Sequence, residues 1–336
     1  MRSLVLWDAG FEEPAEGFQR DLALIAATAA TGRAFVRLWR RPEPALSAGR
    51  FHRIGDVGGR LTRRLSGGRV VPVGPGILAI TLAIPSLDWL APGGPSLKPE
   101  QVLNRALRPT LSWLRRLGLD AFYGGRDLVT VGGRPVALAS FTTFADGAAI
   151  VEQMVAVSTP FSSVTELMDR FDPAGVAMID GKAFADSTTI ASSGVDVEPE
   201  RLPAGLDRAI AEELVAGVSV GAPADVAGAT LADATAFAAF QGERGPAAAG
   251  TASAVGVTML GAVEATARLE TGHVHDLLLC GDVLAPFATL DGIAAACEGV
   301  PVAEPAIANA IRSAMSAPGA YVLGARDLAA IIARLA

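Results

Sequence analysis

The most informative stretch of the chain is Arg63-Arg64-Leu65-Ser66-Gly67-Gly68-Arg69, which precedes the apolar run Ile77–Ile84. Gly67 and Gly68 have no Cβ, so the backbone of this loop can lie directly on a ligand. The arginines offer planar donors for carboxylate or phosphate oxygens. The loop alone leaves a second interpretation open, because Gly-Gly turns between strands are common: a β-hairpin turn with its arginines on a solvated face.

The composition excludes some classes of protein. The chain has 336 residues, enough for one large or two ordinary domains. Its formal net charge of -7 argues against bulk nucleic-acid binding, which requires a basic face. Only Lys98 and Lys182 are lysines, so nearly every cation is an arginine.

The cysteines and histidines do not form a chemical motif. Cys280 and Cys297 lie in apolar segments and are expected to be buried, reduced thiols. The three histidines lack acidic or cysteine partners at a ligand spacing, so we expect no metal site. Neither a secretory leader nor a membrane span is visible in the sequence, which predicts a cytoplasmic protein without membrane contact.

Hydrophobic periodicity predicts an α+β domain in the first two thirds of the chain, because antiparallel strands alternate with helices. The predicted strands are Ser3–Trp7, Phe35–Trp39, Ala45–Arg50, Val70–Val73, Ile77–Ile84, Asp127–Val131, Arg134–Thr143 and Ala149–Ser158. The predicted helices are Pro14–Thr31, Lys98–Leu119, Ser162–Phe171 and Glu200–Val215. On strand Ala149–Ser158, Glu152 and Gln153 are neighbours, so one of them should face out.

The last part of the chain is predicted to form a second, smaller α+β domain. Ala, Gly and Pro dominate between Gly217 and Thr251, where we expect a linker with one helix, Leu231–Phe240. Beyond it, Gly256–Leu269 and His273–Cys280 read as a hairpin. Helices are predicted at Leu290–Cys297, Glu304–Met315 and Arg326–Leu335.

The order of these features resembles the lipoate–protein ligase A family, within the wider group of biotin/lipoyl ligases and octanoyltransferases. Arg63–Gly68 is similar to the family's Arg-Arg-x-Ser-Gly-Gly signature, and Arg69 is more like the octanoyltransferase branch. Gly125–Val129 resembles its Gly-Arg-Asn-Asp-Leu segment without the asparagine. Gly261–Gly272 and Cys280-Gly281-Asp282 resemble the accessory domain of two-domain lipoate ligases.

The resemblance implies a mixed-sheet ligase domain over residues 1–220, a linker over 221–250 and an accessory domain over 251–336. In this family the loop wraps a lipoyl-adenylate (lipoyl-AMP), and an apolar tunnel holds the fatty chain. The implied ligand-binding residues are Arg63, Ser66, Gly67, Gly68, Arg69, Gly76, Asp127, Arg134 and Ala137. Ser66 and the loop amides would hold the phosphate, and Asp127 would position ATP or Mg²⁺.

The chain departs from the family at its catalytic lysine, which bridges the carboxylate and the α-phosphate. In the best register Pro135 takes that position and Leu138 takes a glycine position, so the lysine is predicted to be absent. Other family polar positions fall near Val73, Ile77 and Glu152 or Gln153. The cysteine nucleophile of the octanoyltransferases has no counterpart either, because both cysteines lie in the accessory region.

Three functions stay open at this point. The first is a lipoate–protein ligase-like protein that binds lipoate, a related medium-chain acid or its adenylate and transfers the acyl group to a lysine of a lipoyl carrier domain. If active, it is an ATP-dependent ligase that uses Mg²⁺, with Arg63, Arg69 or Arg134 in the charge role of the lysine. The second is a non-catalytic relative that acts as a scaffold or regulatory partner in protein lipoylation. The third is an acyl ligase for another carboxylate, with Pro135 and Leu138 reshaping the pocket.

Overall fold

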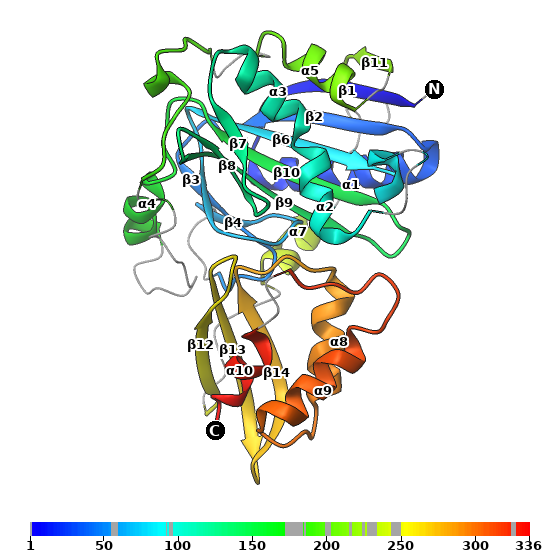
Figure 1. The fold of residues 1–336 in the computed structure, drawn as a ribbon, viewed down its shortest axis with the longest axis vertical. Helices are drawn as coiled ribbons and strands as arrows, with labels where there is room; N and C mark the ends of the chain where they lie inside the picture. The colour runs from blue at the N-terminus through cyan, green and yellow to red at the C-terminus, as the bar shows by residue number, and fades with distance from the viewer. Residues whose placement is uncertain are drawn as a thin grey trace.

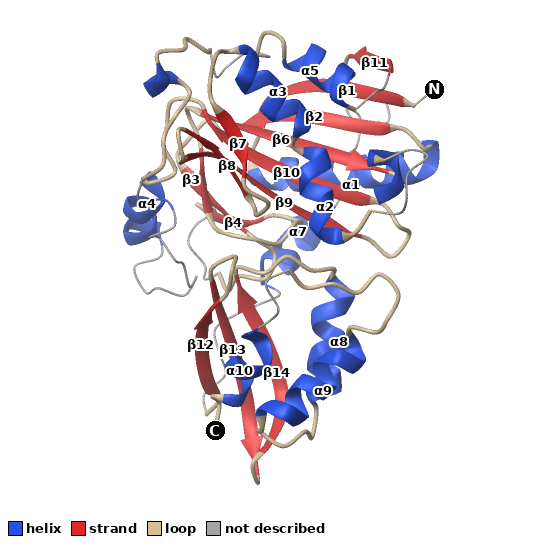
Figure 2. Cartoon of the chain, in the orientation of Figure 1, coloured by secondary structure: helices blue, strands red, loops and turns tan. Residues whose placement is uncertain are grey.

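A large mixed sheet forms the upper part of the molecule (Figure 1, Figure 2). The computed structural model describes residues 2–54, 60–91, 93, 97–171, 184, 186–198, 203–214, 217–223, 226, 234–242, 250–323 and 327–336. Across the sheet the strands are β11 (Gly217–Val220), β1 (Ser3–Phe11), β2 (Ala34–Arg40), β6 (Ile77–Ile84), β10 (Ala149–Ala156), β9 (Arg134–Thr143), β8 (Leu128–Val131) and β7 (Ala121–Tyr123). β1 pairs in parallel with β11 and β2, and the remaining pairs are antiparallel.

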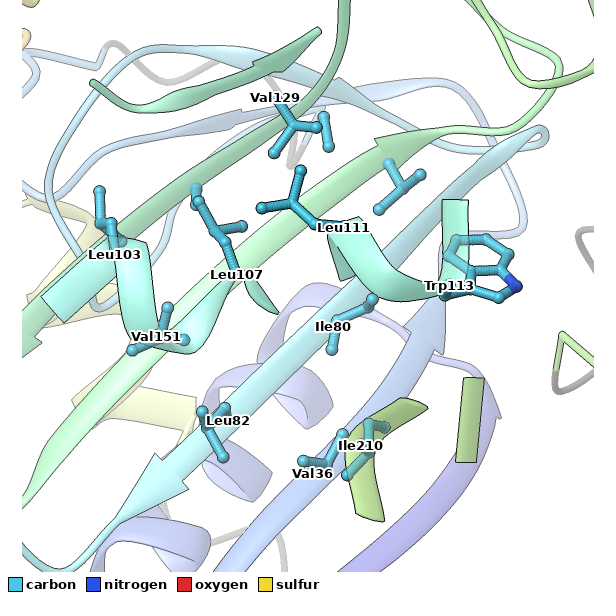
Figure 3. Packing of buried hydrophobic residues seen from close by; sticks show 14 of the residues in the cluster. Val36, Ile80, Leu82, Leu103, Leu107, Leu111, Trp113, Val129, Val151 and Ile210 are labelled. Carbon is cyan, nitrogen blue, oxygen red and sulfur yellow. The ribbon is translucent and has the colours of Figure 1, made fainter. Parts of the chain in front are cut away.

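One face of this sheet is apolar and is covered by helices. Alternate residues of the central strands, such as Val36, Ile80 and Val151, point to this face because side chains alternate along a strand. They pack against α2 (Pro99–Ala106), α3 (Arg108–Arg116) and α5 (Leu206–Glu213). Figure 3 shows Leu107 and Leu111 above the strands in this cluster.

The opposite face carries polar side chains and is also covered. A small sheet, β4 (Leu61–Arg63), β3 (Ala45–Ala48) and β5 (Val71–Val73), lies over it together with α1 (Pro14–Thr31), α4 (Ser163–Phe171) and α7 (Ala234–Gly242). Arg37, Trp39 and Glu152 come from the strands on this side. The space between the large sheet and these elements therefore contains the polar groups with which a site can be built.

Residues 250–336, here called the C-terminal region, form a second sheet with its own core below the first (Figure 1). Its antiparallel strands are β12 (Ala252–Val257), β13 (Ala262–Glu270) and β14 (His273–Gly281), with helices α8 (Phe287–Cys297), α9 (Glu304–Ala314) and α10 (Leu328–Ala333). The C-terminal region contacts the upper part directly: Tyr321 stacks on Phe141 with 5.2 Å between ring centroids.

The α+β class is confirmed, and several elements are found where the sequence predicts them. The helix Pro14–Thr31 and the strands Ile77–Ile84 and Arg134–Thr143 are found with the predicted bounds. Cys280 and Cys297 are buried and form no disulfide among the described residues, and burial raises the pKa of the Cys297 thiol to about 11. None of the described helices is long and apolar enough to cross a membrane.

Two predicted elements are wrong. The single helix Lys98–Leu119 is two helices that meet at Leu107, because Pro109 has no N–H to continue the first one. The strand Gly256–Leu269 is split into β12 and β13 by a turn in which Gly261 has φ +142°. The short strands β4, β7 and β11 were not predicted at all.

Some predicted elements fall partly or wholly outside the described residues. Lys182 is outside them, as are residues 200–202 and 215 of the helix Glu200–Val215, in which α5 is the described helix. Residues 231–233 of the linker helix and Arg326 of the last helix are outside them too.

Replacing Leu107 tests the apolar face. Leu107 is fully buried between the two helices and the sheet, so Leu107→Ala is expected to lower the free energy of unfolding by about 2–5 kcal/mol. Leu22→Ala is the control, because Leu22 on α1 is 37% exposed and should change stability by only about 0.5 kcal/mol. Urea unfolding followed by circular dichroism measures both, and equal losses would contradict the assignment of the core.

Candidate functional site

The loop between β4 and β5 is folded around the guanidinium of Arg64. This guanidinium is buried and donates hydrogen bonds to the carbonyls of Ser47 (2.9 Å), Gly67 (2.7 Å) and Arg69 (2.9 Å). Its Nε lies 3.2 Å from the hydroxyls of both Ser66 and Ser140. Burial lowers the pKa of Arg64, and the negative charge of Glu152 opposes that shift. Arg64 therefore shapes the loop and has its donors engaged by the protein.

Ser66 ties the loop to the polar face of the large sheet. Its N–H donates to Glu152 of β10 (2.8 Å), and its hydroxyl lies 2.6 Å from that of Ser140 on β9. The prediction that Glu152 or Gln153 faces out is wrong, since both are buried. Gln153 accepts a hydrogen bond from Thr110 of α3, because the sheet is covered on both faces.

Gly67 and Gly68 approach the backbone of the C-terminal region. The N–H of Gly68 donates to the carbonyl of Val283 (2.7 Å), and a Cβ on Gly67 would lie 2.0 Å from that oxygen. His52 Nε2 lies 3.1 Å from the carbonyl of Gly68 and 3.2 Å from Asp282 Oδ1. The absence of side chains at these glycines thus permits close contact between the loop and the backbone of the C-terminal region.

Arg69 and Asp127 form a buried ion pair beside the loop. Arg69 Nε donates to Asp127 Oδ2 at 2.6 Å. Burial raises the pKa of Asp127, and the charge of Arg69 opposes that shift. Asp127 Oδ1 is buried and has no hydrogen-bond partner among the described residues. The structure therefore brings Ser66, Gly67, Gly68, Arg69 and Asp127 together around Arg64.

The remaining predicted ligand residues lie elsewhere or face other partners. Arg63 donates to the carbonyls of Arg50 and Gln241, and Arg134 donates to those of Asp186 and Ser187. Gly76 lies in the turn before β6, where its carbonyl accepts the N–H of Val157, Ser158 and Thr159. Ala137 packs with the apolar cluster on the helix-covered face.

The strand that would carry the family lysine offers no cation at the loop. Pro135 accepts a hydrogen bond from the N–H of Thr188, and Leu138 is buried in the cluster between the two sheets. Lys98 is exposed just before α2.

A small cavity lies between α1, β2 and the start of the loop. Its lining residues are Glu13, Pro14, Gly17, Phe18, Asp21, Arg37, Trp39, Arg41, Ser47, Thr62, Arg63, Arg64, Leu65, Val73 and Glu152. It holds about 40 Å³ of space open to a water-sized molecule. Four arginines and three acidic residues line it, so this cavity is not an apolar tunnel.

A buried charge network forms the inner wall of the cavity. Arg37 is fully buried; it pairs with Glu12 and with Asp21 at 2.5 Å. Burial, together with the negative charges of Glu152 and Glu12, raises the pKa of Asp21 to about 8, although Arg37 opposes the shift. Sequence reasoning missed this network. The available signal was an arginine in β2 at a position alternating with Val36 and Leu38.

Arg41 differs from the other arginines of the cavity. Its side chain is buried, yet it donates no hydrogen bond to any residue that the structure describes. Burial lowers its pKa, and Glu13 at the cavity is the largest opposing charge. A guanidinium with open donors in a cavity can bind a carboxylate with two parallel hydrogen bonds. Over the described part of the chain, no group of three or more His, Cys, Asp or Glu side chains is placed to hold a metal ion.

Gly67→Ala tests the contact between the loop and the C-terminal region. The added Cβ would collide with the carbonyl of Val283, so we expect a loss of about 1–3 kcal/mol in the free energy of unfolding. Gly292→Ala in α8 is the matched control, because its Cβ would meet nothing within 4 Å and should stabilise the helix by about 0.5–1 kcal/mol. The same gain in both variants, measured by urea unfolding, would show that the contact is not formed.

The raised pKa of Asp21 predicts the sign of a pH dependence. Between the ordinary pKa of an aspartate and about 8, the folded protein holds a proton that the unfolded chain releases, so stability should fall as the pH rises from 5 to 8. Asp21→Asn cannot titrate and should show a smaller fall over this range. Unfolding curves at pH 5 and pH 8 give both slopes, and identical slopes would contradict the prediction.

The arrangement of elements is shared with solved structures of lipoate ligases. The sequence matches no protein-family model and no curated protein. The structure of P. falciparum LipL1 in complex with lipoate has a TM-score of 0.64 at 11% identity, covering 92% of this chain and 93% of that one. A bi-partite lipoate protein ligase from Thermoplasma acidophilum has a TM-score of 0.51 at 17% identity, with 68% and 89% covered.

A further structure, lipoate-protein ligase A bound with ATP, has a TM-score of 0.51 at 15% identity and covers 68% of this chain and 92% of that one. At identities this low the likeness establishes the fold. This chain has the fold of the lipoate–protein ligases, as the order of its sequence motifs predicts.

Proposed function

We propose that this protein is a lipoate-ligase-like protein that binds a carboxylic acid in the cavity beside the loop. Reaction of the acid with ATP would give the acyl-adenylate and pyrophosphate, and transfer of the acyl group to a lysine of a lipoyl carrier domain would then release AMP. The observation that carries the proposal is Arg41, a buried guanidinium with open donors in a cavity that the loop itself lines. The solved relatives put lipoate first among the candidate acids, since one was solved with lipoate. The T. acidophilum work paired its ligase with an E2 lipoyl domain, which supports a lipoyl domain as acceptor.

The position of Arg41 determines how the acid is oriented in the cavity. Arg41 binds the carboxylate by its two parallel donors, and the buried Arg37 and half-buried Trp39 shield the bound acid from water. Because the carboxylate is held by a guanidinium that lacks another partner, its binding requires no existing ion pair to break.

The phosphate end of the loop does not fit the triphosphate of ATP as it is arranged here. The N–H of Gly68 is engaged by Val283, and the donors of Arg64 are engaged by carbonyl and hydroxyl oxygens. Arg63, Arg69 and Arg134 are the candidates for the charge role of the lysine. Of these, Arg69 belongs to the Ser-Gly-Gly loop, and it donates a hydrogen bond to Asp127. Support for ATP therefore comes from the ATP-bound relative. Mg²⁺ enters the proposal only as the usual partner of ATP phosphates.

Direct binding of the acid is the first test. Isothermal titration calorimetry with lipoate, octanoate and shorter acids should show binding without ATP, weakened at least tenfold by Arg41→Gln. Arg312→Gln is the matched control, because Arg312 is exposed on α9 and far from the cavity lining. If no acid binds, or if Arg41→Gln and Arg312→Gln behave alike, the proposal fails.

A second assay separates the ligase from a non-catalytic relative. The protein is incubated with the bound acid, ATP and Mg²⁺, and acyl-adenylate is sought by mass spectrometry against a lysine-containing ligase of the family. A full ligase is supported if acyl-adenylate is formed and its amount falls at least tenfold in the Arg69→Ala variant. Acid binding without adenylate indicates a protein that takes part in lipoylation as a scaffold or regulatory partner.

A further inference from the structure

The inner end of the cavity is built for a polar group. Asp21 and Glu152 line it, and they are only 5% and 2% exposed. One oxygen of Asp21 accepts from Arg37, and one oxygen of Glu152 accepts from the N–H of Ser66. Each carboxyl group has a second oxygen, Asp21 Oδ2 and Glu152 Oε1, for which the described residues supply no side-chain donor. An aliphatic chain packed against these oxygens would exclude water from them without offering a hydrogen bond in its place, and this loss of hydration costs free energy.

The apolar residues that a tunnel would need are used elsewhere on the same face. Leu138, Met154 and Phe161 are at most 1% exposed and belong to one packed cluster between the large and the small sheet. The charged cavity lies beside this cluster, with Val73 contributing to both. In the described part of the chain, the space next to the loop is therefore polar where a fatty chain would need it to be apolar.

The size of the cavity points the same way. About 40 Å³ open to a water-sized molecule is room for roughly three waters. Arg37 restricts it further, because its pairs with Glu12 and Asp21 hold the guanidinium at the inner wall. The eight-carbon chain of octanoate occupies more volume than about three waters.

Donors and acceptors in the cavity are complementary to a short ligand with two different ends. Arg41 offers donors to a carboxylate, and the free oxygen of the Glu152 carboxylate accepts from a hydroxyl or an amine. We infer that the acid selected by this cavity is a short carboxylic acid with a hydrogen-bond donor at its far end, in place of the aliphatic chain of lipoate. This inference rests on the proposed function, in which this cavity binds the acid.

Isosteric acids test the inference directly. 3-Aminopropanoate and 3-hydroxypropanoate have the same number of heavy atoms as butanoate and differ only in the terminal group. Calorimetry without ATP should show at least one of the two polar acids binding at least tenfold more tightly than butanoate, octanoate or lipoate. Equal or tighter binding of the aliphatic acids would overturn the inference.

Two variants locate the selectivity. Glu152→Gln keeps an oxygen for the N–H of Ser66 but loses the charge, so it should weaken binding of the polar acids at least fivefold and leave butanoate unchanged. The pair Arg37→Met with Asp21→Leu leaves Glu12 paired with Arg20 and makes this part of the inner wall apolar, with Glu152 as its remaining charge, so the preference for the polar acids over butanoate should fall. Circular dichroism confirms that each variant is folded, and unchanged selectivity in the folded variants would overturn the inference.

The outcomes distinguish this inference from the proposed function. Tight lipoate binding that depends on Arg41, with weak binding of the polar acids, would overturn the inference and leave the proposed function intact. Failure of every acid to bind would overturn both.

Discussion

The buried guanidinium of Arg64 is the interaction on which the site depends. Removing a charge of this kind from water is costly unless hydrogen bonds replace its hydration. Here the replacement comes from three separate places: the carbonyl of Ser47 on β3, the carbonyls of the loop itself, and Ser140 on β9. Because these acceptors belong to both sheets, satisfying one side chain fixes the loop relative to the small sheet and to the large one.

The same strands serve the core and the site because their two faces have different chemistry. In β2, Val36 and Leu38 enter the helix-covered core, while Arg37 and Trp39 face the cavity. In β10, Val151 and Glu152 divide in the same way. A polar face can be buried in this molecule because each charge on it finds an opposite charge or a backbone group, as Arg37 does with Glu12 and Asp21.

Local patterns predicted the fold better than they predicted the site. Alternation and helical spacing are properties of short windows, which is why Pro14–Thr31 and Ile77–Ile84 were found. The role of each arginine depends instead on partners far away in the sequence: Arg63 bonds Gln241, and Arg64 bonds Ser140. The motif identified the loop, but composition alone does not reveal which guanidinium is engaged and which, like Arg41, keeps its donors open.

The hydrogen bond from Gly68 to Val283 also has a consequence for how the molecule is made. It joins residues more than 200 positions apart, and contacts of such long sequence separation form late because a large loop must close first. While the ribosome is still synthesising the C-terminal region, the N–H of Gly68 and the imidazole of His52 have neither Val283 nor Asp282 to meet. The first two thirds of the chain, which contain every strand of the large sheet, can fold at that stage. The loop reaches its final conformation only after β14 and Val283 have left the ribosome and packed against it.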